Sequence, residues 1–338
     1  MLTITISVSF EQLQQLLQNS SFTISTVGDN MVNVVSQAPP SFFTLMSQRI
    51  EQLRQSGSIR TAETYKSALL QLRRFWDAIR KGDEDMTVNE VTPHLMEQYQ
   101  QFLRRRDLTM NTVSFYMRRL RAVYRRAVRS GLVSDCQPFS TVYTGIAKTQ
   151  KRALTMNDIR TLKCLHLDDP RQALARDLFL FSFYTRGMSF VDMAYLLRSN
   201  LSGGMLSYRR QKTGQLLTVR WLPCMQAIVD SHVSRSGQYM LPIISGGRGQ
   251  ERNQYRHKQS VVNKQLKEVA RLAGLTVNLT MYCARHTWAT VANSLHVPMS
   301  VISHAMGHTN ARTTEVYIRT ADAALVDQAN ERIIGLMS

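Results

Sequence analysis

The chain has 338 residues, which is enough for two domains that each bury a core. A hydrophobic fraction of 43% is that of a globular protein, and the longest near-continuous apolar run, from Leu178 to Tyr184, is too short to span a bilayer. The formal net charge of +18 indicates a polyanionic partner and leaves little support for a scaffolding role. No basic n-region opens the chain, so we expect a cytoplasmic protein with no membrane part.

Residues 1–40 are predicted to be a separate N-terminal extension, with a β-prone stretch, a short helical stretch and a polar segment that ends in two prolines. Residues 1–48 contain no Lys or Arg and two acids, Glu11 and Asp29, so the excess positive charge belongs to the body of the protein. A segment without cations is a poor candidate for binding DNA phosphates. An interaction element and a poorly ordered extension both fit this composition.

Residues 41–131 are predicted to form a helical bundle. Thr92 and Pro93 are residue types that favour the cap and the first position of a helix. A further helix is predicted from about residue 109 to Ser130, with Gly131 as its stop.

This last predicted helix has two unlike halves. At 100° per residue, the arginines fall in one arc and a set of apolar residues falls in the opposite arc, namely Val113, Tyr116, Met117, Leu120, Val123, Tyr124, Ala127 and Val128. A solvated face usually mixes charges, but no acid lies between residues 111 and 130. We therefore predict that the arginines bind the DNA backbone or a groove. The predicted DNA-binding residues of this region are Arg104, Arg105, Arg106, Arg118, Arg119, Arg121, Arg125, Arg126 and Arg129.

Residues 132–152 are predicted to be a basic linker. The segment holds a Pro, a Gly and three closely spaced cations, Lys148, Lys151 and Arg152, which we add to the predicted DNA-binding set. A clamp around a duplex needs a hinge of this kind. An ordinary inter-domain loop has a similar composition, so the pattern alone does not separate the two.

Residues 153–338 are predicted to form a second domain. Thr155 to Asp158 has the spacing of a capping box and opens a predicted helix. The segment from Arg171 to about Leu197 is strongly apolar and has a helical period. The chain from Ser260 onward is again mainly helical in pattern.

A hairpin is predicted within this domain. Two β-prone runs, Met205 to Arg210 and Leu216 to Leu222, are joined at Lys212-Thr-Gly214. The predicted fold of the whole chain is therefore mainly α with a small antiparallel sheet.

The most specific sequence motifs lie in the last 60 residues. It reads Arg285-His-Thr-Trp-Ala-Thr290, then Met306-Gly-His308, then Thr313-Thr-Glu-Val-Tyr317. Each piece alone is common in helical proteins. Together, and with Lys212 on a hairpin upstream, the set resembles the phage integrase family, the tyrosine recombinases. In that family an Arg opens a helix before His-Thr-aromatic-Ala-Thr, a Gly-His follows, and the nucleophilic Tyr comes nine residues later.

The resemblance covers about residues 41–338 and implies a helical core-binding domain followed by a tyrosine-recombinase catalytic domain. It implies a site-specific recombinase that cleaves and rejoins DNA through a 3′-phosphotyrosyl intermediate on Tyr317, without a metal or cofactor. Arg285 and His308 fall in phosphate-binding positions, and Lys212 resembles the general acid for the leaving 5′-oxygen. It also implies a homotetramer on two double-stranded DNA sites, which integrates, excises or inverts a mobile element. Such a protein is expected to be associated with the nucleoid and to have accessory DNA-bending proteins as further partners.

Two positions depart from the family pattern. Most members have a His where this chain has Tyr282, so we expect that phenol to orient groups and to be a weak base. Most members have an Arg in a Gly-Leu-Arg-x-x-Glu box, where this chain has Ser189. Arg186 stands three residues earlier, and positions three apart on a helix share a face. We therefore predict that Arg186 supplies the second arginine, with Ser189 as a lesser phosphate contact. A buried ion pair of Arg186 with Asp192 or Asp177 is the alternative.

The residue types suit this chemistry independently of the family. Attack on a phosphodiester builds negative charge on its non-bridging oxygens, and one fixed donor there is worth on the order of 10²–10³ in rate. The planar fork of Arg matches phosphate geometry and keeps its charge. A tyrosine, with a free pKa of about 10, needs help from such a site to act as a nucleophile.

Three other interpretations stay open at this level. A DNA-binding regulator or weakened relative would keep the fold, and Tyr282 and Ser189 motivate it. A type IB topoisomerase-like enzyme would share the chemistry without site preference. A metal site at His304 and His308 has the right spacing but lacks a carboxylate cluster and an HExxH motif.

Overall fold

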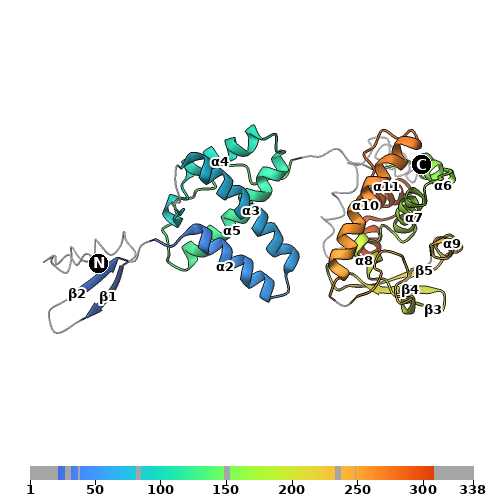
Figure 1. The fold of residues 1–338 in the computed structure, drawn as a ribbon, viewed down its shortest axis with the longest axis horizontal. Coiled ribbons are helices and arrows are strands. Elements are labelled where there is room, and N and C mark those ends of the chain that lie inside the picture. Colours follow the sequence, from blue (N-terminus) through green and yellow to red (C-terminus); the bar gives the residue numbers. More distant parts are fainter. Residues whose placement is uncertain are drawn as a thin grey trace, which may run out of the picture. The chain divides into compact units, whose positions relative to one another are not determined.

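The computed structural model describes residues 39–80, 85–147, 153–232, 237–247 and 249–307, and two short strands near the N-terminus. The chain divides into two compact units, Met1–Thr149 and Gln150–Ser338 (Figure 1). The N-terminal strands, β1 (Phe22–Thr26) and β2 (Val32–Ser36), pair antiparallel. Within the described ranges, no helix is both long enough and apolar enough to cross a bilayer.

The first unit is helical, as its periodicity predicted. Its elements are α2 (Phe42–Gln55), α3 (Ile59–Ile79), the 3-10 turn η1 (Val88–Glu90), α4 (Pro93–Arg105) and α5 (Met110–Arg129). The predicted start of α4 is confirmed, because the Thr92 side chain accepts the N–H of Leu95 and Pro93 takes the first position. Thr109 caps α5 in the same way, and Gly131, with φ of +69°, ends it.

The apolar arc of α5 is buried as expected. Seven of its residues enter the core of this unit, which α2, α3 and α4 complete with side chains such as Leu72 and Phe75. Only Val128 of the predicted arc stays half-buried. The buried residues of the arc are Val113, Tyr116, Met117, Leu120, Val123, Tyr124 and Ala127.

The first part of the predicted linker packs onto this unit. Phe139 and Val142 are buried in the same core, which gives residues 132–147 an apolar anchor. The N–H of Tyr143 donates to the side-chain oxygen of Gln100 at 2.7 Å. The composition of this segment hid two apolar side chains among polar ones, which is why it looked like a free linker.

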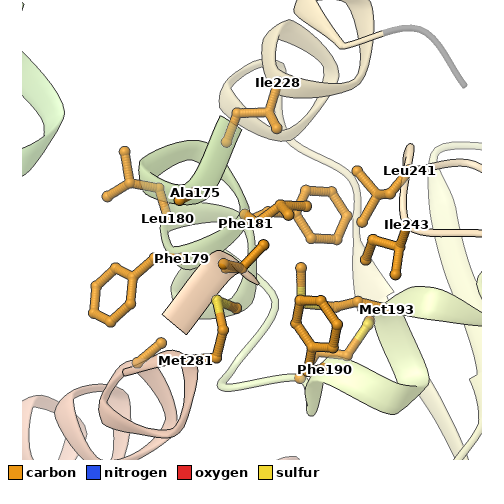
Figure 2. Close-up of a cluster of buried hydrophobic side chains, with 14 of the residues drawn as sticks. Ala175, Phe179, Leu180, Phe181, Phe190, Met193, Ile228, Leu241, Ile243 and Met281 are labelled. Carbon is orange, nitrogen blue, oxygen red and sulfur yellow. The ribbon is translucent and has the colours of Figure 1, made fainter. Parts of the chain in front are cut away.

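The second unit contains most of the secondary structure. Its elements are α6 (Met156–Cys164), α7 (Pro170–Tyr184), α8 (Phe190–Ala194), the 3-10 turn η2 (Arg198–Asn200), β3 (Leu201–Ser202), β4 (Met205–Arg209), β5 (Leu216–Arg220), α9 (Pro223–Ser231), α10 (Glu251–Leu272), α11 (Met281–Ser294) and α12 (Met299–Ala305). The second half of helix α7 is buried because α6, α9, α10 and α11 pack around it. Figure 2 shows Phe179 and Phe181 of α7 among side chains that include Met281 of α11 and Ile228 of α9.

The predicted helical segment from Arg171 to Leu197 is in fact two helices. Helix α7 ends at Tyr184, and the chain turns through Arg186 and Gly187, with φ of +61° and +71°. The N–H of Gly187 donates to the carbonyl of Ser182 at 2.8 Å, which closes the helix end with a left-handed glycine. The apolar period runs on into α8, so periodicity alone concealed the break.

The hairpin prediction is confirmed. Strands β3, β4 and β5 form an antiparallel sheet in that order, with Met205 opposite Arg220 and Arg209 opposite Leu216. The turn is closed by the N–H of Arg210 on the carbonyl of Gln215, at 2.9 Å. Lys212 is exposed at its tip.

The core of the first unit predicts a stability contrast within one helix. Leu72→Ala should lower the free energy of unfolding of this unit by about 2–5 kcal/mol, because Leu72 is fully buried and its loss leaves a cavity. Leu70→Ala, at a position that is 48% exposed, should cost less than about 0.5 kcal/mol. Urea unfolding of Trp221→Phe, Trp288→Phe protein, in which the buried Trp76 reports on this unit, measures both. Equal losses at the two leucines would contradict the packing described above.

Candidate active site

Among the predicted catalytic residues that the structure describes, Arg285 is the most tightly held. It lies in the second turn of α11, which packs on α7, and is 5% exposed. Its Nη1 donates to the carbonyl of Gly187 at 2.8 Å and its Nη2 to the carbonyl of Met306 at 2.6 Å. A buried guanidinium needs such acceptors, because an unsatisfied one would lose its hydration without compensation.

Two neighbours bring these carbonyls to Arg285. Helix α12 packs on α11 through Ile302 and Met306, which places the end of α12 beside α11. On the other side Gly187 lies directly on Arg285, since a Cβ at position 187 would stand 2.7 Å from the Arg285 Cα. Only glycine fits both this contact and the left-handed backbone.

Asp192 ties the hairpin to α8. One carboxylate oxygen, Oδ1, accepts the N–H of Gln211 at 2.8 Å, next to Lys212. The other, Oδ2, accepts the hydroxyl of Ser189 at 2.6 Å and lies 3.9 Å from Nε of Arg210. Because this carboxylate is buried and binds the N–H of Gln211, it fixes the backbone of the turn that carries the exposed Lys212.

Arg210 was not among the residues predicted from the sequence. It follows β4 directly, is 7% exposed, and donates from Nη1 to the carbonyl of Gly307. A signal was present, because Leu206, Tyr208 and Arg210 alternate along one face and the first two are apolar and buried. An arginine that continues the inward face of a strand needs a buried partner.

Arg186 does not sit where the helix argument placed it. It occupies the left-handed turn after α7, so it shares no helix face with Ser189. Its Nη1 donates to the carbonyl of Thr218 on β5 at 3.3 Å. Neither alternative ion pair is found in the described part of the chain: Asp177 pairs with Arg176 and His232, and Asp192 lies 3.9 Å from Nε of Arg210.

Ser189 caps α8. Its hydroxyl accepts the N–H of Asp192 at 3.4 Å and donates to the carboxylate of the same residue. This is the usual task of a serine at a helix start, and it commits the hydroxyl that we expected to contact phosphate.

Tyr282 is accessible. It lies one turn before Arg285 on α11, is 56% exposed, and meets the ring of His286 edge-on with centroids 4.6 Å apart.

The charged groups of the site act on the pKa of Tyr208, a buried residue of β4. Burial raises the pKa of its phenol, and the carboxylate of Asp192 raises this pKa further. Arg285, Arg210 and Arg186, in this order of strength, act in the opposite direction and lower the pKa. All three arginines therefore lie within electrostatic range of one buried point.

Several predicted residues lie outside the described part of the chain. These are His308 and Tyr317, and also Lys148, Lys151 and Arg152. The described chain ends at Gly307, whose carbonyl Arg210 binds, so the last described turn leads directly to His308. Within the described ranges, no three His, Cys, Asp or Glu side chains gather as they would around a metal ion.

The arginines of the first unit differ in their surroundings. Arg119 donates to the Thr64 hydroxyl at 3.3 Å and lies over the ring of Phe115, and burial lowers its pKa. It therefore serves the packing of the unit. Arg106 donates to Gln71, and Arg126 donates to Gln52. Arg121 is half-buried, and the exposed members of the predicted set are Arg104, Arg105, Arg106, Arg118, Arg125, Arg126 and Arg129.

Both units are similar to known families. A phage integrase SAM-like domain model matches residues 41–142, and a phage integrase family model matches residues 227–324. Tyrosine recombinase XerD of Pseudomonas aeruginosa is 22% identical over 278 residues, which are 79% of this chain and 89% of the relative. Together the two models match more than half of the chain.

The chain belongs to the phage integrase family of tyrosine recombinases. It is a site-specific DNA recombinase, and the interpretations as a regulator or as a topoisomerase are not favoured. The catalytic match includes the positions of Arg285, His308 and Tyr317. Neither model covers the segment that carries Arg186, Ser189 and Lys212.

Solved structures show the same fold. A lambda integrase dimer bound to a COC′ core site is 14% identical, with a TM-score of 0.64 over 82% of the recombinase and 95% of that chain. The Tn1549 transposon integrase in complex with transposon right end DNA is also 14% identical, with a TM-score of 0.65 over 87% of the recombinase and all of that chain. The mainly helical fold with a small antiparallel sheet is thus confirmed.

Gly187 yields a paired prediction. Gly187→Ala should slow DNA cleavage by the recombinase on the order of 10²-fold, because the added Cβ displaces Arg285 and removes its fixed donors. Gly204→Ala is the matched control, since Gly204 has nearly the same φ, +72° against +71°, and nothing within 4 Å of the added Cβ. Single-turnover cleavage rates measure both. A similar loss in the two variants would assign the effect to backbone strain and not to Arg285.

Proposed function

We propose that Tyr317 is the nucleophile of this recombinase and that Arg285 binds the phosphate it attacks. The single observation that carries the proposal is the guanidinium of Arg285, buried and fixed by two backbone carbonyls at the turn that leads to His308. A fixed cation beside a phosphate stabilises the charge that develops during attack without reorganising first. His308 is the next donor along the chain and would add a hydrogen bond to the same phosphate.

The proposed reaction balances as two exchanges at phosphorus. The phenolic oxygen of Tyr317 bonds to phosphorus and loses its proton, while the bond from phosphorus to the 5′-oxygen breaks. The result is a 3′-phosphotyrosyl bond and a 5′-hydroxyl, whose proton comes from Lys212 at the exposed tip of the hairpin. Attack of a 5′-hydroxyl from the partner strand reverses these steps and releases Tyr317.

Tyr282 fits a supporting role. A phenol with its ordinary pKa near 10 is a weak base at neutral pH, so it orients by hydrogen bonding better than it moves protons. Its exposed place one turn before Arg285 supports a contact with the DNA or with the Tyr317 phenol. Proton removal from Tyr317 then falls to His308 or to water.

Double-stranded DNA is the proposed partner of the first unit. The exposed arginines of α5 line a helix that contains no acid, and phosphate contacts of this kind supply much of the affinity of DNA-binding proteins. Lys148, Lys151 and Arg152 are proposed to continue this surface. The net charge of +18 supports the same partner.

The assembly and biological role follow the structural relatives. Lambda integrase has been solved as a tetramer bound to a Holliday junction, which supports a homotetramer on two DNA sites as the active form. The likeness to a transposon integrase supports a role in integration, excision or inversion of a mobile element. We place this role in the cytoplasm, on the nucleoid, with accessory DNA-bending proteins as further partners.

The nucleophile is tested by covalent trapping. Wild-type protein and Tyr317→Phe are incubated in EDTA with nicked duplexes tiled across the DNA that flanks the gene. On a denaturing gel, wild type should give a shifted protein–DNA band on a limited set of duplexes and Tyr317→Phe should give none. Both proteins should bind DNA with similar affinities, because the change removes one uncharged hydroxyl and leaves every Lys and Arg in place. Protein–DNA complexes on a native gel without any covalent adduct would instead support a DNA-binding regulator. Covalent adducts on every duplex would support a topoisomerase-like enzyme.

The basic surface is tested by salt dependence. Arg118→Gln and Arg125→Gln should each weaken DNA binding and reduce the slope of log affinity against log salt by roughly one at most. Arg54→Gln is the control with the same change in net charge, because Arg54 is already 3.4 Å from Glu51 on α2. An equal effect of all three changes would mean that net charge, and not the α5 surface, sets the affinity.

A further inference from the structure

The second arginine of the phosphate site is the least explained part of the proposed mechanism. The sequence suggested Arg186, but this side chain is half-exposed and is held by a strand carbonyl. Ser189 stands where most family members have an arginine, and its hydroxyl is already hydrogen-bonded to Asp192 at the start of α8. The inference below rests on the proposed function, since it concerns the same phosphate.

Arg210 and Arg285 reach the same turn from opposite elements. Arg285 comes from α11 and donates to the carbonyl of Met306, whereas Arg210 comes from the end of β4 and donates to the next carbonyl, that of Gly307. Consecutive residues are about 3.8 Å apart between their Cα atoms, so the two guanidinium groups bind neighbouring points of one turn. A ligand bound by Arg285 at this turn is within reach of Arg210 as well.

Gly307 brings the turn close to Arg210. A Cβ at position 307 would lie 2.6 Å from Cδ of Arg210, so the backbone passes directly over the arginine side chain. Nε of Arg210 is buried and has no hydrogen-bond partner within the described ranges. The guanidinium therefore keeps one unused N–H donor while its Nη1 binds the Gly307 carbonyl.

Asp192 lies between Arg210 and Ser189, the residue that stands where most family members have an arginine. Its Oδ2 contacts the hydroxyl of Ser189 at 2.6 Å and lies 3.9 Å from Nε of Arg210. The carboxylate on α8 therefore still has an arginine partner, but this arginine comes from the end of β4 and not from the start of α8.

We propose that Arg210 is the second arginine of the phosphate site and a catalytic residue of the recombinase. In the DNA complex its guanidinium donates to a non-bridging oxygen of the phosphate that Tyr317 attacks, beside Arg285. Asp192 holds the guanidinium in place, and the phosphate oxygen takes over the hydrogen bond that the Gly307 carbonyl accepts in the free protein. Arg186 is held by the carbonyl of Thr218 on β5 and takes no part in this contact.

The test compares two arginines on two substrates. Nicked duplexes carry either the normal phosphodiester or an uncharged methylphosphonate at the cleavage position. Arg210→Ala and Arg186→Ala are assayed for the rate of adduct formation, each relative to wild type on the same duplex. An arginine that contacts a charged non-bridging oxygen matters less once that charge is gone, whereas a purely structural arginine matters equally for both.

We expect Arg210→Ala to be slower than wild type on the order of 10²–10³-fold on the phosphodiester and within about 10-fold of it on the methylphosphonate. Arg186→Ala should stay within about 10-fold of wild type on both substrates. Equal losses of Arg210→Ala on the two duplexes, or cleavage at the wild-type rate, would overturn the proposal. So would the substrate-dependent pattern appearing for Arg186→Ala and not for Arg210→Ala.

Folding and function are separated by two further measurements. Because Arg210 is buried beside Asp192, thermal unfolding is recorded for every variant, and Arg210→Lys, which keeps the charge, replaces Arg210→Ala if that protein does not fold. The lysine variant should show the same substrate dependence with a smaller loss, since it lacks the planar fork. Wild type that forms no adduct on any duplex would reject the proposed function itself, whereas an active wild type with an indifferent position 210 rejects only this inference.

Discussion

The buried guanidinium of Arg285 organises the catalytic unit. It joins three pieces of chain that are far apart in sequence: the turn at Gly187, helix α11 and the turn at Met306. Each hydrogen bond to a carbonyl contributes about 1.5–3 kcal/mol because the donor is charged, and loss of either acceptor would leave buried charge unsatisfied. The position of the functional site therefore depends on an interaction made entirely within the protein, before DNA arrives.

The support beneath this arginine is a rigid apolar core. The second half of helix α7 is buried and ends at the turn that presents the Gly187 carbonyl, while α11 carries Arg285 against this turn. Protein interiors are packed as densely as organic crystals, so such a base resists small displacements. An active site that must place a phosphate to within a fraction of an ångström benefits from this arrangement.

Local chemistry predicted much of the fold. The cap at Thr92, the arcs of α5 and the hairpin around Lys212 each follow from residue type and spacing over a few positions, and the structure has them. The same logic failed between Arg171 and Leu197, because periodicity continued across a left-handed turn that only tertiary packing reveals. That failure carried into the site, since the expected position of Arg186 assumed an unbroken helix.

The site itself was predictable in its motifs and not in its contacts. Arg285 was found from a local pattern, but its acceptors lie 98 and 21 residues away. Arg210 was missed because its partners, Asp192 and Gly307, come from separate elements, and no short window of sequence contains all three. Likewise, Phe139 and Val142 anchor a segment that looks like a linker until the core they join is known.

Asp192 accepts from a hydroxyl and from a backbone amide, with a guanidinium nearby, and these three groups come from two different parts of the fold. Such a shared acceptor makes substitutions at Ser189, Arg210 and the hairpin turn interdependent, so their effects will not simply add. It also offers an evolutionary route. A cation can move from one element to another through sequences that always keep the carboxylate partnered, so an essential charge can change its position along the chain without an intermediate that leaves it uncompensated.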